Sequence, residues 1–284
     1  MQLWLAILLG IVQGLTEFLP ISSTAHLRIV PALCGESDPG AAFSAVIQIG
    51  TLVAVLAYFR ADIFRIGMAW FGETLRGKIA QSQDGRMGWM MIVATAPIVV
   101  LGLVFKDAIS GQLRSLYVIA AALIGLAVLL VVAEQYVLRR AARGVTPKTL
   151  DDVGWADAIA VGFAQAVALI PGASRSGVTI TGGLFLGLSR ETAARFSFLL
   201  SLPAVFAAGV YELYKERQEL LASSADAANL VVATVISGIV GYIAIAGLLR
   251  YLRSRTMYVF VVYRIVLGLV LLALLAAGKL DPLR

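Results

Sequence analysis

Long apolar runs alternate with short polar breaks along this chain, and most of the runs have the length of a membrane span. A helix needs about 20 mainly apolar residues to cross the hydrocarbon core of a bilayer. Uncharged runs of about this size, the last interrupted only by Arg264, lie at 41–59, 87–105, 115–133, 196–211, 227–249 and 256–278. Because Arg195 and Glu212 bound the shortest run, we expect that helix to begin about a turn earlier. The pattern predicts six transmembrane helices.

Two further apolar stretches are broken in the middle. Residues 2–30 are apolar to Leu15, become polar around Pro20 and then turn apolar again. Residues 158–189 do the same around a break that begins at Pro171. Each stretch predicts a half-helix, a loop and a second half-helix. Since irregular backbone at membrane depth must be covered by protein or water, we expect two re-entrant hairpins that line a site.

The two halves of the chain resemble each other. Gly10–Gln13 aligns with Gly162–Gln165 at an offset of 152, and Ser22 falls on Ser174 at the same offset. Each half then holds one hairpin followed by three spans, and three is odd, so the second copy enters the membrane from the opposite side. The predicted fold is an all-α polytopic membrane protein with six transmembrane helices and two re-entrant helix–loop–helix hairpins in an inverted-topology repeat.

Composition supports a membrane protein and excludes other classes. Of the 284 residues 60% are hydrophobic and 14% are charged, with a mean hydropathy of +0.90. Soluble domains carry about 25% charged residues, so an ordinary cytosolic enzyme and a disordered chain are both excluded. Cys34 is the only cysteine and cannot form an internal disulfide. We predict one integral-membrane domain over 1–284, with internal repeats at approximately 1–138 and 153–278.

The net charge of +6 reports orientation rather than nucleic-acid binding, because the basic residues cluster in short loops between apolar runs. If both hairpins return to the side from which they come, 14 basic residues lie on one side and 7, including Arg284, on the other. The positive-inside rule makes the first side cytoplasmic. The chain is therefore expected to be multi-pass, with both termini outside.

The first break carries the densest polar cluster. Gln13 and Glu17 are four residues apart and share a helix face, and Pro20 ends that helix. Hydroxyls at the N-terminus of the next half-helix suit a phosphate, because free N–H groups and the positive end of the helix dipole meet there. The hydroxyl residues in question are Ser22, Ser23 and Thr24. The plainer alternative is a capped hairpin whose Glu17 only pairs with a buried base.

His26 is the only histidine, and a structural role competes with a catalytic one. It follows Ser23 by three residues, so the two share a face if the second half-helix has begun. Serine and histidine at that range could form an activated nucleophile or protonate a leaving group. No aspartate follows to complete a triad, which weakens a serine-hydrolase interpretation.

The second break is the more specific signal. Gly172 and Gly177 permit close backbone approach, and Arg175 offers a cationic fork that matches phosphate oxygens. The hydroxyl donors around that arginine are Ser174, Ser176 and Thr179. The alternative is a Gly/Ser turn in which Arg175 serves as the counter-ion of Glu17, and the two interpretations are compatible.

The segment Gln13 to His26 resembles the first signature of the bacterial undecaprenyl-diphosphate phosphatases, the bacitracin-resistance family, and Pro171 to Thr179 resembles the second. The similarity covers nearly the whole chain. It implies hydrolysis of a C55 isoprenyl diphosphate, released by cell-wall synthesis, to the monophosphate lipid carrier and phosphate. It also implies a divalent cation, Mg²⁺ or Ca²⁺, and an active site that opens to the outer face of the bacterial cytoplasmic membrane.

Carried across position by position, the resemblance implies roles for particular residues. We expect the catalytic group to consist of Glu17, Ser23, His26 and Arg175, with Glu17 also holding the metal. We expect the substrate-binding group to consist of Gln13, Ser22, Thr24, Gly172, Ser174, Ser176 and Thr179. Gln13 stands where the family accepts Glu or Gln and cannot act as a base, and Ala25 replaces the glycine of many relatives. Attack by Ser23 and attack by a metal-bound water both stay open.

The rival function is a transporter or flippase of a phosphorylated lipid, because inverted repeats with broken helices are typical of transporters. The expected partners are an isoprenyl diphosphate lipid and the membrane, without nucleic acid, and a homodimer is left open. Arg264 lies inside the last span, where a charge is costly. We expect it to form a structural ion pair, with a place near the substrate as the alternative.

Overall fold

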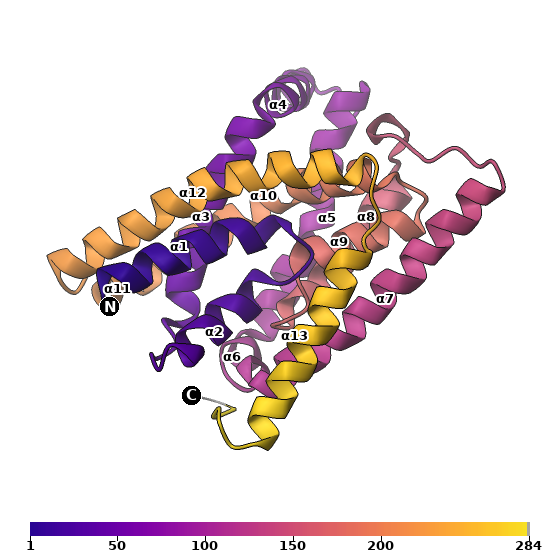
Figure 1. Ribbon diagram of the computed structural model, residues 1–284. Helices are drawn as coiled ribbons and strands as arrows, with labels where there is room; N and C mark the ends of the chain where they lie inside the picture. Colours follow the sequence, from indigo (N-terminus) through magenta and orange to yellow (C-terminus); the bar gives the residue numbers. More distant parts are fainter. Residues whose placement is uncertain (283–284) are drawn as a thin grey trace.

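The computed structural model describes residues 1–282 and is built of helices, with no β-strand in that range (Figure 1). Arg284, counted above on the less basic side, lies outside the described residues. Six helices of the described chain are long and apolar enough to cross a membrane. They are α3 (Gly40–Tyr58), α5 (Gln83–Val104), α7 (Leu116–Ala142), α10 (Arg190–Lys215), α12 (Ser224–Leu252) and α13 (Tyr258–Ala276). Each coincides with one predicted run, so the six predicted spans are confirmed.

Both broken stretches are pairs of shorter helices, with the breaks where the sequence predicts them. The first pair is α1 (Leu3–Phe18) and α2 (Ser23–Leu33), and the second is α8 (Trp155–Ala166) and α9 (Arg175–Phe185). At 1.5 Å per residue, the 16 residues of α1 reach about 24 Å, which is too short for the ~30 Å hydrocarbon core. The one-turn helix η3 (Val167–Leu169) directly follows α8.

The remaining helices connect the long ones. Between the long helices lie α4 (Arg60–Leu75), α6 (Lys106–Ser110), η1 (Gln112–Arg114), η2 (Leu150–Asp152) and α11 (Arg217–Leu220). The helix α4 packs on α5, and η1 leads directly into α7.

Small residues let the long helices approach closely. The helix α1 runs beside α12, and α12 also packs on α3 (Figure 1). A Cβ atom added at Gly50 of α3 would lie 1.9 Å from the backbone oxygen of Thr234, and one added at Gly14 of α1 would lie 2.8 Å from that of Ser237. Any residue larger than glycine at either position would collide with the neighbouring helix. Small residues commonly allow such close packing between membrane helices.

The two breaks meet inside the molecule. The helix α9 packs on α7, α8 and α10, while α13 runs along α7 on the side of the first hairpin (Figure 1). The Ser176 hydroxyl at the start of α9 donates to the backbone oxygen of Leu19 in the first break, at 3.0 Å. The fold therefore brings together two polar segments that lie about 150 residues apart in sequence.

Candidate active site

Both breaks end in the same local geometry. Ser22 and Ser174 are the N-caps of α2 and α9, with φ angles of 75° and 71°. Their hydroxyls accept hydrogen bonds from the backbone N–H groups of Ala25 at 3.3 Å and Gly177 at 3.1 Å. Each cap contributes about 1 kcal/mol, which offsets part of the roughly 1–3 kcal/mol that a left-handed non-glycine residue costs. Both half-helices thus present a capped, dipole-positive N-terminus at the place where the breaks meet.

Glu17 connects the two breaks. Its carboxylate is 4% exposed, and one oxygen, Oε1, forms an ion pair with Nη2 of Arg175. The other oxygen, Oε2, accepts hydrogen bonds from Gln13 Nε2 at 2.8 Å and Ser23 Oγ at 2.7 Å. A buried carboxylate must be paired to remain charged, and Glu17 is. The predicted Gln13–Glu17 face and the predicted counter-ion role of Arg175 are both present.

Two buried polar atoms beside Glu17 have no hydrogen-bond partner among the described residues. They are Nη1 of Arg175, a donor, and Oε1 of Gln13, an acceptor. Such atoms are rare in folded proteins and call for an explanation. A donor and an acceptor left open on either side of one carboxylate are what a bound anion and its counter-cation would use.

The hydroxyls of the second break divide into two groups. Ser174 Oγ lies 3.2 Å from Ser176 Oγ, and Ser176 ties the loop to the first break as described. Thr179 Oγ1 lies 2.6 Å from Ser197 Oγ of α10 and also donates to the backbone oxygen of Arg175 at 2.7 Å. Ser176 and Thr179 therefore brace the loop that carries Arg175.

His26 is held away from Ser23. Its Nδ1 lies 2.7 Å from the backbone oxygen of Ser22, and its Nε2 lies 2.6 Å from the hydroxyl of Tyr263 on α13, whose ring stacks on the imidazole. The group in contact with the Ser23 hydroxyl is Glu17. Tyr263 could not be found from sequence, because it lies 237 positions from His26 and no motif connects the two residues.

The expected ion pair of Arg264 is wrong for the described residues. The guanidinium is 1% exposed and donates instead to five backbone oxygens at 3.0–3.2 Å. These belong to Pro20, Ala122, Leu123, Gly172 and Ala173. The physical reason is that the two breaks leave the carbonyls of Pro20, Gly172 and Ala173 outside any helix, and a guanidinium has five N–H groups to donate to such oxygens. Arg264 fastens both breaks to α7.

A cavity of about 160 Å³ lies where the breaks meet. The site residues from sequence that line it are Glu17, Ser22, Ser23, Thr24, Gly172, Ser174 and Arg175. The others, Gln13, His26, Ser176 and Thr179, contact the lining residues or their backbone from behind. Gln48 of α3 also lines the cavity, and sequence reasoning missed it. Its signal was available, since it is the only amide side chain in the run 41–59.

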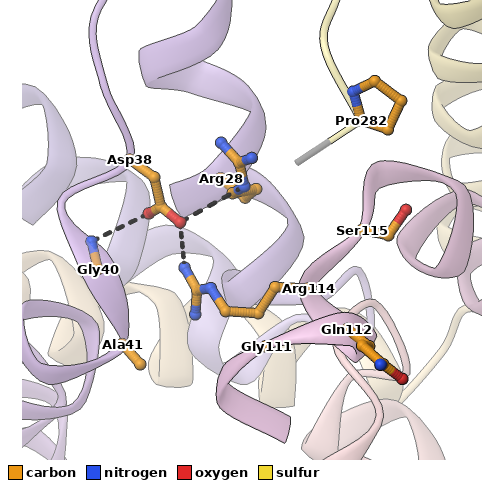
Figure 2. Close-up of a pocket in the computed structure, with 9 residues that line it drawn as sticks. All are labelled: Arg28, Asp38, Gly40, Ala41, Gly111, Gln112, Arg114, Ser115 and Pro282. Carbon is orange, nitrogen blue, oxygen red and sulfur yellow. Dashed lines mark hydrogen bonds and ion pairs between the residues drawn. The ribbon is translucent and has the colours of Figure 1, made fainter. Parts of the chain in front are cut away.

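A second, larger cavity of about 730 Å³ lies away from these residues (Figure 2). The guanidinium groups of Arg28 and Arg114 converge there on the carboxylate of Asp38, with nitrogen–oxygen distances of 3.4 and 2.5 Å. The other oxygen of Asp38 accepts from the N–H of Gly40 at 3.1 Å. Asp281 also interacts electrostatically with Arg28. The charges of this cluster are balanced, so we assign it to holding α2, α3 and η1 together.

The residues beside Glu17 fit a divalent cation that is shared with a phosphate. No three His, Cys, Asp or Glu side chains of the described chain gather as a ready metal site. Mg²⁺, however, is commonly held by one or two carboxylates together with substrate phosphates. The Glu17 carboxylate and the unpartnered Oε1 of Gln13 supply protein oxygens for such an ion.

Comparison with known proteins agrees with this chemistry. The family profile described as bacitracin resistance protein BacA matches residues 6–270. The chain is 61% identical to an undecaprenyl-diphosphatase of Chlorobium phaeobacteroides (strain BS1), over 99% of this chain and 100% of the relative. It is 61% identical to an undecaprenyl-diphosphatase of Chloroherpeton thalassium, over 97% of this chain and 98% of that protein. A protein of the same name from Chlorobaculum tepidum is 57% identical, over 99% of this chain and all of the relative.

Proposed function

The chain belongs to the bacitracin resistance protein family BacA, and we propose from this premise that it is a membrane phosphatase that hydrolyses undecaprenyl diphosphate to undecaprenyl phosphate and phosphate. It is a multi-pass membrane protein, and its relatives of 55–61% identity carry the name undecaprenyl-diphosphatase. Such a reaction recycles the lipid carrier of cell-wall synthesis. It also fits a bacitracin-resistance family.

The observation that carries this proposal is the Glu17–Arg175 pair across the two breaks. The pair lies at a cavity into which two helix N-termini open, and Arg175 keeps Nη1 without a partner among the described residues. Guanidinium groups and helix N-termini are the groups that bind phosphate. Glu17 meanwhile lies within hydrogen-bond reach of a hydroxyl, as a general base must.

In the proposed reaction, Arg175 and the N-terminal N–H groups of α2 and α9 grip the diphosphate and stabilise charge on the moving phosphoryl group. Ser23 Oγ attacks the terminal phosphorus while its proton passes to Glu17. The bond from that phosphorus to the bridging oxygen breaks, and the departing undecaprenyl phosphate takes the proton from Glu17, which restores the carboxylate. Water then attacks the phosphoserine and gives its proton to the restored Glu17 carboxylate. Glu17 passes that proton to Ser23 Oγ as the bond from Oγ to phosphorus breaks, and phosphate is released.

A divalent cation, when bound by Glu17 and Gln13, supplies charge neutralisation for the diphosphate. His26 has a positioning role in this scheme: it receives support from Tyr263 and fixes the backbone of Ser22, the cap of α2. Gln48 lines the same cavity and is suited to hydrogen-bond the diphosphate from the side of α3.

We also propose that the α1–α2 and α8–α9 pairs are re-entrant hairpins in an inverted repeat. Support comes from the matching caps at Ser22 and Ser174, and from the short reach of α1. With the more basic side in the cytoplasm, the termini and the opening of the site face outward.

Phosphate release in detergent tests the function, because transport has no meaning there. Purified protein given C55 isoprenyl diphosphate should release phosphate and undecaprenyl phosphate in equal amounts, and EDTA should stop the release. A folded protein that releases no phosphate would contradict the proposal and favour the transporter hypothesis.

Trapping tests the covalent step. Glu17→Asp shortens the side chain of the proposed base and is expected to slow turnover. This variant should retain labelled phosphate from the terminal position of the substrate on Ser23. Absence of label, together with an active Ser23→Ala variant, would show instead that water attacks directly.

A further inference from the structure

The cavity at the breaks has an apolar end as well as a polar one. Besides the polar lining already described, its wall consists of Ile98 from α5, Ala168 and Ile170 near η3, and Ala204, Val205 and Ala208 from α10. No charged side chain belongs to this second group. The substrate class has the same division, because a diphosphate is joined directly to an isoprenyl chain.

The helix α10 carries the apolar end from the interior to the surface of the molecule. Ala204 and Ala208 are four residues apart and share a face of α10, and Val205 beside them is 6% exposed. Ala208, in contrast, is exposed, as is Ile170 at 39%. The lining therefore reaches the face that lipid covers, and two alanines leave room there for a chain.

The partner wall on α5 has a related feature. Pro97 precedes the lining residue Ile98, just as Pro203 precedes the lining residue Ala204. Proline has no N–H, so each helix lacks one backbone hydrogen bond next to the cavity, which is a common cause of bending. The backbone hydrogen bonding of α5 and of α10 is therefore interrupted where each helix lines the cavity.

We propose that the isoprenyl chain of the substrate leaves the polar site through the seam between α5 and α10, over Ile98, Ala204 and Ala208. This inference rests on the proposed function and deepens it by assigning the tail-binding surface. The polar end fixes the diphosphate, and continuity of the cavity then leads the first isoprene units along the alanine face into lipid. Because Ala204 and Ala208 lie in the half of α10 nearer Lys215, the tail enters the leaflet on that side.

A bulky residue in the seam tests the assignment. Ala208→Trp should lower kcat/KM for C55 diphosphate about tenfold or more, because the indole ring would occupy the space that the isoprenyl chain needs. A tenfold loss corresponds to about 1.4 kcal/mol. Hydrolysis of a C5 diphosphate, which has a single isoprene unit, should stay within about twofold, a difference well below 1 kcal/mol. The matched control is Ala207→Trp, at an exposed neighbour outside the cavity lining that points about 100° away on the helix.

A measurement without turnover completes the test. A diphosphate probe with a diazirine in its second isoprene unit should label peptides of α5 and α10 in the unaltered protein and in Ala207→Trp. The label there should fall in Ala208→Trp. Equal C55 hydrolysis by Ala208→Trp and Ala207→Trp, or label confined to other helices, would overturn the seam while leaving the phosphatase proposal intact. Failure of the unaltered protein to hydrolyse C55 diphosphate would instead reject the function itself.

Discussion

At the scale of single residues, the site is a set of polar atoms that are either paired across the two breaks or left open for a ligand. Both carboxylate oxygens of Glu17 have protein partners, whereas Arg175 Nη1 and Gln13 Oε1 have no partner among the described residues. The open atoms explain why polar groups are retained at membrane depth, where each is costly. They also separate the groups that meet the substrate from those that hold the loops.

Gln48 lines the cavity, so we group it with the residues proposed to meet the substrate. Replacement by Leu keeps the size of the side chain and removes its hydrogen bonds, so kcat/KM for C55 diphosphate should fall about tenfold. Gln48→Glu should be worse, because it adds a negative charge beside a diphosphate. Steady-state kinetics in detergent give the order, and a Gln48→Leu variant as active as the unaltered protein would remove Gln48 from the site.

At the scale of helices and loops, Arg264 holds the two breaks in place. Arg264→Met should leave the carbonyls of Pro20, Gly172 and Ala173 without donors, at about 1–3 kcal/mol each. The thermal midpoint and the turnover should fall together, and Arg264→Lys should recover only part of both. The exposed Arg250→Met serves as control. An Arg264→Met protein as stable as this control would show that the five contacts do not hold the breaks.

The packing of α3 on α12 gives a second prediction at this scale. Gly50→Ala places a Cβ 1.9 Å from the backbone oxygen of Thr234, so the helices must separate and stability should fall by about 1–3 kcal/mol or more. Gly247→Ala on α12 has nothing within 4 Å of the added Cβ and should leave the thermal midpoint unchanged or higher. Similar midpoints for the two variants would contradict the close approach.

At the scale of the whole molecule, the proposed orientation places the C-terminal end of α2 outside. Cys34 is exposed there and is the only cysteine, so the unaltered protein carries its own reporter. A membrane-impermeant maleimide should label Cys34 in intact spheroplasts. With Cys34→Ser, a cysteine placed by Lys78→Cys, between α4 and α5, should react only after the membrane is opened. The reverse pattern would invert the topology.

The sequence predicts much of this architecture, since the six spans follow from uncharged runs and the two breaks from Pro20 and Pro171. It also offers the pairing of Glu17 with Arg175 as an alternative to phosphate binding, because a charge at depth needs a partner, and the structure contains this pair. The sequence does not predict the contact of His26 with Tyr263 or the contacts of Arg264 with backbone oxygens. Those contacts depend on how α13 packs, and a carbonyl left open by a broken helix has no mark in the sequence.

The central claim is that both breaks form one phosphatase site through Glu17 and Arg175. The most direct test measures turnover of C55 diphosphate by Glu17→Gln, Arg175→Ala and the double variant, each checked for an unchanged elution profile. The account predicts that each single change abolishes nearly all hydrolysis and that the double variant is no worse, since residues that act as a unit are not additive. Near-normal turnover by either single variant would contradict it.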